Sequence, residues 1–357
     1  MTENFPPERR RTKSIRVGDV QIGNGAPITV QSMTNTKTAN VDATVKQILE
    51  LQDVGCEIVR VAVPDRDSAE AIPEIKKQIS IPLVADIHFN YHLALAAIEA
   101  GCDKIRINPG NIGDIKRVEK VINSAREAEI PIRIGVNSGS LEPELLKKYG
   151  YPSAAALAES ALNHIELFEK LNFYNMIISI KASDLPRTVE ANRMLAEKCE
   201  YPIHLGVTES GGELEGAVKS AAALGLLLNE GIGDTIRISL TADPVKEVKA
   251  AFDLLRAFKI RNVGIEIISC PTCGRAEVDV EKIAEEIREK TKNLLFPLKV
   301  AVMGCVVNGP GEAREADIGL AGGKEQFLLF TRGKIVKKID QSSAVDELIK
   351  MIHGMIK

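Results

Sequence analysis

Short apolar runs alternate with longer amphipathic stretches along most of the chain. Each apolar run has the length and the β-branched content of a strand that is buried on both faces. In the amphipathic stretches, apolar positions recur with the helical period, which is typical of helices that cover a sheet. Asp, Ser and Gly mark the joins, as expected for helix caps and turns. The pattern therefore predicts repeated strand–helix units.

Eight units of this kind are predicted. The strands are residues 28–32, 57–63, 82–87, 104–108, 131–137, 176–181, 203–208 and 235–240. The helices are residues 41–54, 68–78, 91–100, 115–128, 153–171, 185–199, 214–229 and 244–258. This number favours a closed (β/α)8 barrel, the TIM barrel, over the alternative of a doubly wound open sheet. Residues 12–25 alternate around Gly18 and Asp19 and predict a β-hairpin before the first unit.

The pattern changes after residue 258. Strands are predicted at residues 263–268, 298–303 and 318–321, followed by a hairpin over residues 326–340 that turns at Arg332 and Gly333. Helices are predicted at residues 280–290 and 344–356. We therefore expect two domains, a barrel over residues 1–258 and a small α+β domain over residues 259–357.

Composition narrows the class of protein. The 357 residues are 45% hydrophobic and 27% charged, with a net charge of −3. This is a globular composition, and it gives no support for nucleic-acid binding. No apolar run reaches the roughly 18 residues that span a membrane, and the polar N-terminus lacks a signal core. We expect a cytoplasmic protein with reduced cysteines, neither bound to nucleic acid nor inserted in a membrane.

Three of the six cysteines gather in two motifs of the second domain. S-C-P-T-C-G-R contains Cys270 and Cys273, and G-C-V-V-N-G-P-G-E contains Cys305 and Glu312. Thiolates at this spacing select zinc, copper(I) or an iron–sulfur cluster. Three cysteines leave one corner of a four-ligand site open for a weaker oxygen donor or a substrate. A structural zinc site and a redox-active Cys-x-x-Cys pair are the alternatives.

Cations occupy similar places in five of the predicted barrel strands: Arg60, Arg106, Arg133, Lys181 and Arg237. A cation inside a parallel sheet is costly unless it is paired, so a single one would indicate an ion pair. Five at matching positions would converge at the carboxyl end of the barrel, where active sites of this fold lie. Converging Arg and Lys side chains favour a phosphate or diphosphate ligand.

Other polar residues stand at the same strand ends: Asp86, His88, Asn108, Asn137, Thr208, Glu209 and Ser239. Asp86 is interpreted as a counter-ion of the arginines. Glu209 is either a second counter-ion or an acid whose pKa a closed site would raise toward neutrality. Together the two domains indicate redox chemistry on a small phosphorylated molecule.

At this point the chain resembles a known family, that of 4-hydroxy-3-methylbut-2-enyl diphosphate synthase. The resemblance rests on Q-S-M-T-N-T, I-R-I-N-P-G-N-I-G, G-V-N-S-G-S and G-V-T-E of the barrel and on the two cysteine motifs. It runs from the first strand to the end of the chain and is similar to the short bacterial form. It implies a TIM barrel followed by an iron–sulfur domain like those of sulfite and nitrite reductases.

The resemblance also implies a reaction and a site. In the non-mevalonate isoprenoid pathway (MEP pathway), 2-C-methyl-D-erythritol 2,4-cyclodiphosphate takes two electrons, its ring opens and water leaves. A [4Fe-4S] cluster would be held by Cys270, Cys273, Cys305 and an exchangeable Glu312, and Glu209 would protonate the departing oxygen. The implied contacts to the cyclic diphosphate are Arg60, His88, Arg106, Asn108, Arg133, Asn137, Lys181, Thr208, Arg237 and Ser239.

The partners implied by the resemblance are flavodoxin or ferredoxin as electron donor and a second copy of the chain. In this homodimer, the cluster domain of one subunit covers the barrel of the other. Two other functions are alternatives: a barrel synthase with a structural zinc domain, and an iron–sulfur electron-transfer module. The barrel cations argue against the second, because an electron carrier has no use for them.

Overall fold

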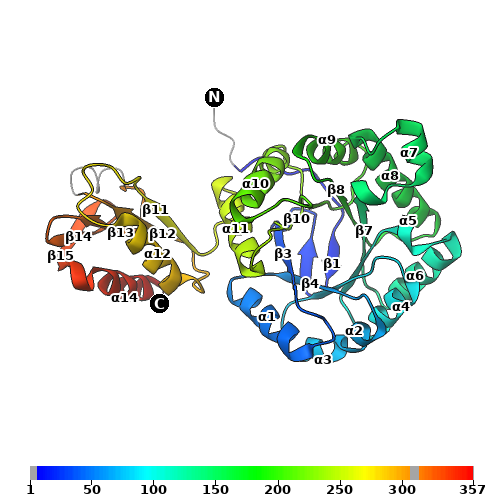
Figure 1. Ribbon diagram of the computed structural model, residues 1–357, viewed down its shortest axis with the longest axis horizontal. Coiled ribbons are helices and arrows are strands. Elements are labelled where there is room, and N and C mark those ends of the chain that lie inside the picture. The colour runs from blue at the N-terminus through cyan, green and yellow to red at the C-terminus, as the bar shows by residue number, and fades with distance from the viewer. Residues whose placement is uncertain (1–5, 306–312, 357) are drawn as a thin grey trace. The chain divides into compact units, whose positions relative to one another are not determined.

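The structure is a computed structural model that describes residues 6–305 and 313–356. The chain forms two compact units that divide between Arg261 and Asn262 (Figure 1). The expected boundary after residue 258 lies slightly earlier, directly after helix α11 (Pro244–Ala257).

Eight parallel strands form the barrel of the first unit. They are β3 (Thr29–Met33), β4 (Ile58–Ala62), β5 (Leu83–Asp86), β6 (Lys104–Ile107), β7 (Ile132–Asn137), β8 (Met176–Lys181), β9 (His204–Leu205) and β10 (Thr235–Ile236). Their order is β8-β7-β6-β5-β4-β3-β10-β9. A parallel bridge between Ile178 and Ile203 joins β8 to β9 and completes the circle. Each strand overlaps one predicted run, so the predicted barrel is confirmed and the open sheet is excluded.

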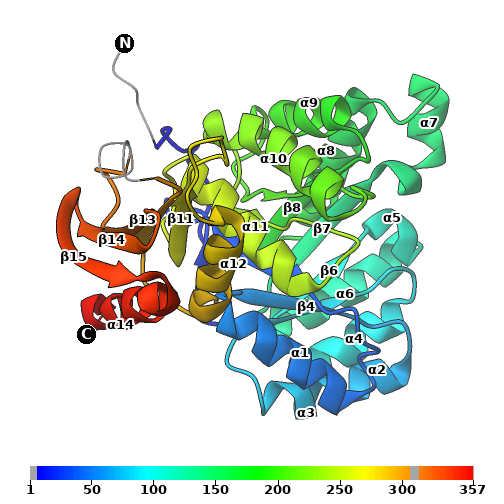
Figure 2. The same ribbon diagram turned by 60° about the vertical axis from the view of Figure 1, so that its left-hand side comes forward.

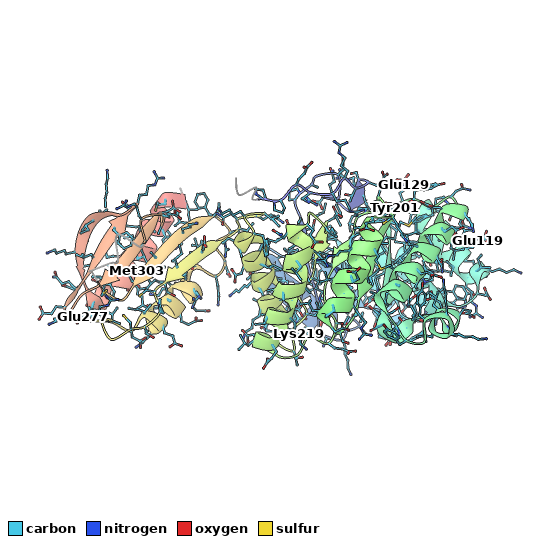
Figure 3. All side chains as sticks on the ribbon, turned by 90° about the horizontal axis from the view of Figure 1, so that it is seen from above. Glu119, Glu129, Tyr201, Lys219, Glu277 and Met303 are labelled. Carbon is cyan, nitrogen blue, oxygen red and sulfur yellow. The ribbon has the colours of Figure 1, made fainter. Side chains whose placement is uncertain are left out.

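Helices surround the barrel. They are α1 (Val41–Asp53), α2 (Arg66–Glu70), α3 (Ile72–Lys76), α4 (Tyr91–Glu99), α5 (Pro109–Ile112), α6 (Ile115–Glu127), α7 (Pro143–Tyr149), α8 (Ala154–Lys170), α9 (Leu185–Ala196), α10 (Glu213–Asn229) and α11, with a 3-10 turn η1 (Ser138–Ser140). Figure 3 shows exposed charged side chains such as Glu119 and Lys219 pointing away from the barrel. No helix in the described ranges has both the length and the apolar content to cross a membrane.

Two helical features depart from the prediction. The helix expected over residues 68–78 is interrupted at Ala71, because Pro73 has no backbone N–H and starts a new helix, α3. Helices α5 and α7 were not predicted. Each begins at a proline, and α7 ends at Gly150, whose left-handed φ of 77° stops the helix after two turns.

The predicted N-terminal hairpin closes the amino end of the barrel. Strands β1 (Ile15–Val17) and β2 (Val20–Ile22) pair antiparallel around the expected turn. Their apolar side chains pack against Ile58, Val84 and Ile177, which lie at the starts of β4, β5 and β8. Figure 1 shows the hairpin within the ring of strands. Apolar packing thus fills this end of the barrel, and the polar strand residues lie toward the other end.

The second unit is one five-stranded sheet with helices on one face. The strands are β11 (Ile265–Ser269), β12 (Leu298–Met303), β13 (Ile318–Gly322), β14 (Gln326–Thr331) and β15 (Lys334–Asp340), paired in that order. The first three are parallel and the last two are antiparallel to their neighbours. Helices α12 (Val280–Thr291) and α14 (Ala344–Ile356) pack against one face (Figure 2); a short 3-10 turn, η2 (Gln341–Ser343), precedes α14. The predicted order of elements is confirmed throughout the described part of this unit.

Candidate active site

A polar cavity of about 260 Å³ lies at the carboxyl end of the barrel strands. Nine of the ten residues predicted to contact an anionic ligand line it: Arg60, His88, Arg106, Arg133, Asn137, Lys181, Thr208, Arg237 and Ser239. Met33, Asp86 and Ser179 complete the lining. The carboxyl end is where TIM barrels carry their active sites, so this cavity is the candidate site of the first unit.

Strand register explains why these residues meet. Asp86 on β5 is level with Arg106 on β6, and Arg106 is level with Arg133 on β7. Neighbouring residues at the same level of parallel strands point to the same side, here into the barrel. Two inward-facing glycines give the long side chains room. A Cβ on Gly135 would come within 2.5 Å of Arg106 Nε, and one on Gly206 within 2.5 Å of Lys181 Nζ.

Asp86 joins two of the cations. Its Oδ1 accepts a hydrogen bond from Arg106 Nη1 at 3.1 Å, and its Oδ2 lies 3.6 Å from both Arg60 Nε and His88 Nε2. Burial by itself raises the pKa of Asp86, but Arg60, His88 and Arg106 outweigh burial and hold this pKa below its ordinary value of 3.8. Asp86 is therefore the ionised counter-ion that the sequence predicted.

A second counter-ion, Glu247 at the start of α11, was not predicted. Its two oxygens accept hydrogen bonds from Arg237 Nε and Nη2 at 3.2 and 3.1 Å, and it also accepts from Ser32 Oγ and from the backbone N–H of Leu240. In the sequence, Glu247 has the position of an ordinary acidic residue in the first turn of a helix. Only the three-dimensional structure distinguishes it from a surface acid, by its 3% exposure.

The cavity holds more positive than negative charge. Five cations line it together with one carboxylate, Asp86, and Arg237 pairs with Glu247 outside the lining; neither Arg133 nor Lys181 has a carboxylate partner within the described residues. Burial, helped by the charge of neighbouring arginines, lowers the pKa of Arg133 and of Lys181 well below ordinary values. Burial likewise lowers the pKa of Arg60 to about 10, although Asp86 partly restores it. A polyanionic ligand would supply the missing negative charge.

Below the cavity lies a second buried polar layer that sequence reasoning missed. Lys104 and His204 are fully buried, and Lys104 Nζ and His204 Nε2 have no hydrogen-bond partner in the described structure. Burial, together with the charges of Arg133 and Arg60, lowers the pKa of Lys104 well below 10.5. The sequence K-I-R-I gave a signal, because its alternation places both Lys104 and Arg106 on the inner face of β6.

Two predicted residues lie outside the cavity lining. Asn108 is buried and caps α5, since its Oδ1 accepts from the N–H of Gly110 and its Nδ2 donates to Ser140 Oγ at 2.8 Å. Glu209 is exposed in the loop after β9 and forms no hydrogen bond or ion pair with the described residues. Its φ of 54° places a non-glycine residue in the left-handed region, which is uncommon outside functional sites and tight turns.

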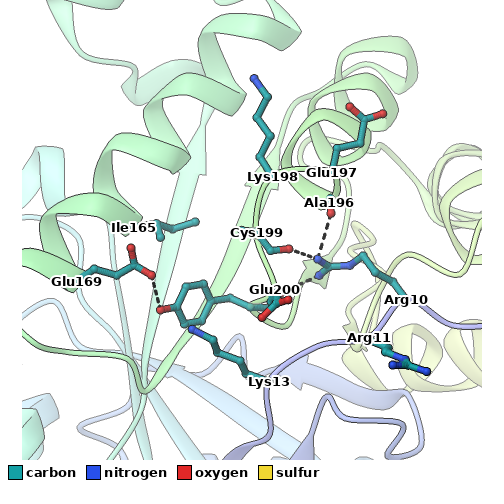
Figure 4. Close-up of a pocket in the computed structure, with 11 residues that line it drawn as sticks. Arg10, Arg11, Lys13, Ile165, Glu169, Ala196, Glu197, Lys198, Cys199 and Glu200 are labelled. Atoms are coloured by element: carbon teal, nitrogen blue, oxygen red, sulfur yellow. Dashed lines mark hydrogen bonds between the residues drawn. The ribbon is translucent and has the colours of Figure 1, made fainter.

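A larger cavity of about 540 Å³ lies near the amino end of β9 (Figure 4). Two of its cations, Arg10 and Lys13, already have protein partners. Arg10 donates to three backbone carbonyls around the end of α9, and Lys13 Nζ lies 4.0 Å from the centre of the Tyr201 ring. The Tyr201 hydroxyl in turn donates to Glu169 at 2.7 Å. These contacts attach the N-terminal segment to the barrel, and we assign this cavity a structural role.

In the second unit, the two cysteine loops begin at the carboxyl ends of neighbouring strands. Cys270 directly follows β11 and Cys305 follows β12, and these strands are parallel neighbours. The backbone N–H of Gly304 points at Cys270 Sγ, 3.2 Å away. Cys273 is exposed, and the backbone and guanidinium of Arg275 lower the pKa of its thiol. N–H groups directed at cysteine sulfurs are typical of thiolates that bind an iron–sulfur cluster.

The described residues alone do not assemble a complete metal site. Within the ranges 6–305 and 313–356, no three His, Cys, Asp or Glu side chains are grouped closely enough to hold a metal ion. The predicted fourth ligand, Glu312, lies outside the described residues.

Comparison with known proteins covers both units. The chain matches the GcpE TIM-barrel domain over residues 12–252 and the GcpE protein C-terminal domain over residues 266–354. It is 56% identical to the 4-hydroxy-3-methylbut-2-en-1-yl diphosphate synthase (flavodoxin) of Bacillus cereus, over 98% of this chain and 94% of the relative. The enzyme of the same name from Bacillus licheniformis is also 56% identical, over 97% of this chain and 94% of the relative.

Solved structures with similar barrels have distant sequences. A dihydropteroate synthase from Xanthomonas albilineans superposes with a TM-score of 0.51 at 15% identity, over 69% of this chain and 97% of that chain. At this identity the likeness concerns the fold alone. The two family matches and the relatives from Bacillus confirm the resemblance inferred from the motifs, and the chain belongs to the GcpE family.

Proposed function

We propose that this protein reductively opens 2-C-methyl-D-erythritol 2,4-cyclodiphosphate to 4-hydroxy-3-methylbut-2-enyl diphosphate. In this reaction a ring C–O bond breaks, two electrons and two protons enter, and one oxygen leaves as water. The observation that carries the proposal is the cavity lined by five cations, of which Arg60, Arg106 and Arg237 pair with the two carboxylates of Asp86 and Glu247. A diphosphate supplies several negative charges, and its oxygens match the donor geometry of arginine. The names of the relatives from Bacillus support the same reaction.

The residues in and around the cavity would have different roles. Asp86 and Glu247 fix the guanidinium groups of Arg60, Arg106 and Arg237, so that these donors are oriented before the ligand arrives. Arg133 and Lys181 have no carboxylate partner among the described residues, and we infer that they neutralise the diphosphate. His88, Asn137, Thr208 and Ser239 would add hydrogen bonds. Asn108 would act indirectly, by holding the loop after β6.

Glu209 is the proposed acid that protonates the departing oxygen. It directly follows Thr208, which lines the cavity, and its backbone holds a left-handed conformation. Because its carboxyl has no partner in the described part of the chain, it is available to a ligand at the mouth. A positioned acid of this kind contributes about 100-fold or more to a rate.

Cys270, Cys273, Cys305 and Glu312 are the proposed ligands of a [4Fe-4S] cluster. The residues present fit this group: two cysteine loops leave one sheet edge, and the Gly304 N–H is directed at the Cys270 sulfur. When bound, the cluster supplies electrons singly to the ligand. The oxygen ligand Glu312 would leave one position that a substrate can take. The likeness of this unit to sulfite and nitrite reductase domains stays a prediction.

The proposed partners are a flavodoxin or ferredoxin and a second copy of the chain. The names of the relatives specify flavodoxin. Exposed apolar side chains stand in segments that follow the carboxyl ends of the strands: Phe89, Ile115, Tyr151 and Leu214, with 56–73% exposure. Such side chains at the mouth of a barrel are suited to a protein cover, which supports a dimer in which one subunit's second unit covers the partner's barrel.

The test is anaerobic purification followed by metal analysis and turnover. We expect brown protein with about four irons per chain, a stoichiometry that a [4Fe-4S] site requires, and conversion of the cyclodiphosphate with a strong reductant. Colourless protein with one tightly bound zinc would instead support the barrel synthase with a structural zinc domain. A cluster that gives no turnover, and no spectral change with the cyclodiphosphate, would support an electron-transfer module.

A further inference from the structure

The β14–β15 hairpin of the second unit carries an unusual surface. Four cations, Arg332, Lys334, Lys337 and Lys338, occur in a stretch without acidic residues. The first five residues of β15 are exposed, including Ile335 at 56% and Val336 at 55%. We call Arg332, Lys334, Ile335, Val336 and Lys338 the hairpin patch. Its three cations form no ion pair with any residue in the described part of the chain.

The strand register places Ile335 and Lys338 of this patch on one face of the sheet, whereas Lys334, which is opposite Thr331, points to the other face. Lys338 is opposite Leu328 and Ile335 is opposite Phe330, and a bulge inserts Val336 between these pairs. Phe330 belongs to the apolar cluster of that face, and Leu328 packs against it. Lys337 points to the other face, where it pairs with Glu347 of α14 at 3.1 Å. Adjacent lysines on β15 thus serve different surfaces.

One row of residues connects the hairpin patch with the cysteine loops. Met303 is level with Ala321, Ala321 with Leu328, and Leu328 with Lys338. Met303, which is labelled in Figure 3, lies two residues before Cys305. Strands β12 and β15 are three strand spacings apart, about 14 Å. Because β15 runs parallel to β12, the carboxyl end of β15 lies at the same end of the sheet as the cysteine loops.

We propose that the hairpin patch is the docking surface for the electron donor, and that this donor is an acidic carrier protein of the flavodoxin class. The proposal rests on the proposed function, since it names the surface through which the cysteine site is reduced. At each of two encounters the donor would be oxidised by one electron, and the cofactor held by the cysteine loops would accept that electron.

Three physical arguments favour this partner. Unpaired surface cations attract an acidic protein and increase its association rate. The exposed Ile335 and Val336 offer an apolar centre within the basic rim, which is the usual arrangement of a transient interface. Finally, a partner seated on this face stands within a few strand widths of the cysteine loops. Lysines on an edge strand also prevent strand-to-strand association, so an experiment must separate the two roles.

The experiment compares two reductants in the full-length holoenzyme. The variant Arg332→Glu/Lys338→Glu is assayed with reduced flavodoxin and, separately, with reduced methyl viologen, a small molecule that needs no docking surface. We expect the KM for flavodoxin to rise about tenfold or more and its dependence on ionic strength to weaken. Turnover with viologen stays within about twofold of wild type, because the substitutions leave the barrel and the cysteine loops untouched.

The matched control makes the same charge change on the helical face. Lys282 of α12 and Lys350 of α14 are exposed, and Lys282→Glu/Lys350→Glu is expected to keep the wild-type KM for flavodoxin. Equal KM values for wild type and the hairpin variant would overturn the proposal, as would an equal rise in both double variants. If the double substitution impairs folding, Lys338→Gln tests the same face with less disturbance.

Failure of the proposed function has a different signature. If the wild-type protein does not turn over with viologen, the proposed reaction is wrong, but that result does not test the docking surface. In that case flavodoxin binding itself is measured, by the change in its flavin fluorescence on titration with the holoenzyme. Wild-type binding that the hairpin variant loses and the control keeps would still support the docking surface. Equal binding by all three proteins would overturn it.

Discussion

The two units hold their candidate groups in different ways. In the barrel, Arg60, Arg106, Arg133 and Lys181 belong to strands and are at most 8% exposed. In the second unit, the cysteines stand in loops beyond the strand ends, and Cys273 is exposed. Strand pairing fixes the first set without any ligand, whereas the second set stands in loops that the described structure does not bring together. We therefore propose that the barrel site is preformed and that the cysteine site is completed by the cofactor it binds.

The largest expected effect comes from a substitution in the cysteine site of the second unit, which leaves the barrel unchanged. Cys305→Ser removes a proposed cluster ligand, so we expect loss of the iron and of measurable turnover. The affinity for the cyclodiphosphate, measured by calorimetry, should change little because the barrel cations keep their places. Loss of ligand affinity together with the iron would show that the barrel site is not preformed.

Glu209 tests whether a loop residue of the barrel unit has a chemical role. Glu209→Gln keeps the size of the side chain and removes the acid, so kcat is expected to fall about 100-fold or more. KM should stay within about threefold of wild type, since Glu209 does not line the cavity. A wild-type kcat in this variant would show that Glu209 is not the acid in the reaction.

A substitution of Lys181 tests the role of the cations on the barrel strands. Lys181→Met keeps the length of the side chain but removes a charge that has no carboxylate partner in the described structure. We expect affinity for the cyclodiphosphate to fall about 30-fold or more, equivalent to about 2 kcal/mol, with unchanged iron content. Lys219→Met on the exposed face of α10 is the control and should bind normally. Equal affinities for the two variants would exclude Lys181 from the ligand site.

The smallest effect has the opposite sign and concerns stability. Lys104→Met replaces a fully buried amine without a hydrogen-bond partner by an apolar side chain, and is expected to stabilise the barrel by about 1–3 kcal/mol. The pKa of Lys104 is lowered in the folded state, so the unfolded chain binds its proton more tightly. Wild-type stability therefore gains from Lys104 as the pH rises toward 10.5.

The advantage of Lys104→Met should accordingly shrink between about pH 7 and pH 9, by up to about 1.4 kcal/mol per pH unit. Urea unfolding of both proteins at several pH values measures it. A destabilised variant, or an advantage that grows with pH, would mean that Lys104 has a partner, such as bound water, that keeps it charged.

The sequence predicted the barrel well because its signals are local and repeated. Each apolar run became a strand, and caps such as Asn40, Asp114 and Ser153 accept N–H hydrogen bonds at the helix starts. Helix α7 was missed because it is short and lies within the connection between β7 and α8. The interruption at Ala71 was missed because an apolar stripe continues across it through Ile72 and Ile75.

The site was predictable where side chains follow strand alternation and not where they arrive from elsewhere. Arg60 and Arg106 were recognised as cations at odd places in apolar strands. Glu247 contacts Arg237 from the following helix, α11, and in the sequence it has the position of an ordinary acidic residue near a helix start. Asn108 was assigned to the ligand through the family resemblance, which stays a prediction, and in this structure its side chain caps α5. Fold position alone does not tell a contact residue from one that supports the loop.

The N-terminal hairpin has a kinetic consequence. Because Val17, Ile22 and their neighbours fill the amino end of the barrel, small molecules exchange with the cavity through its carboxyl end. Product must then leave by the route through which the next substrate enters, and both compete for the same cations. Product inhibition that is competitive with the cyclodiphosphate is the expected steady-state behaviour, so the concentration of product itself would slow turnover.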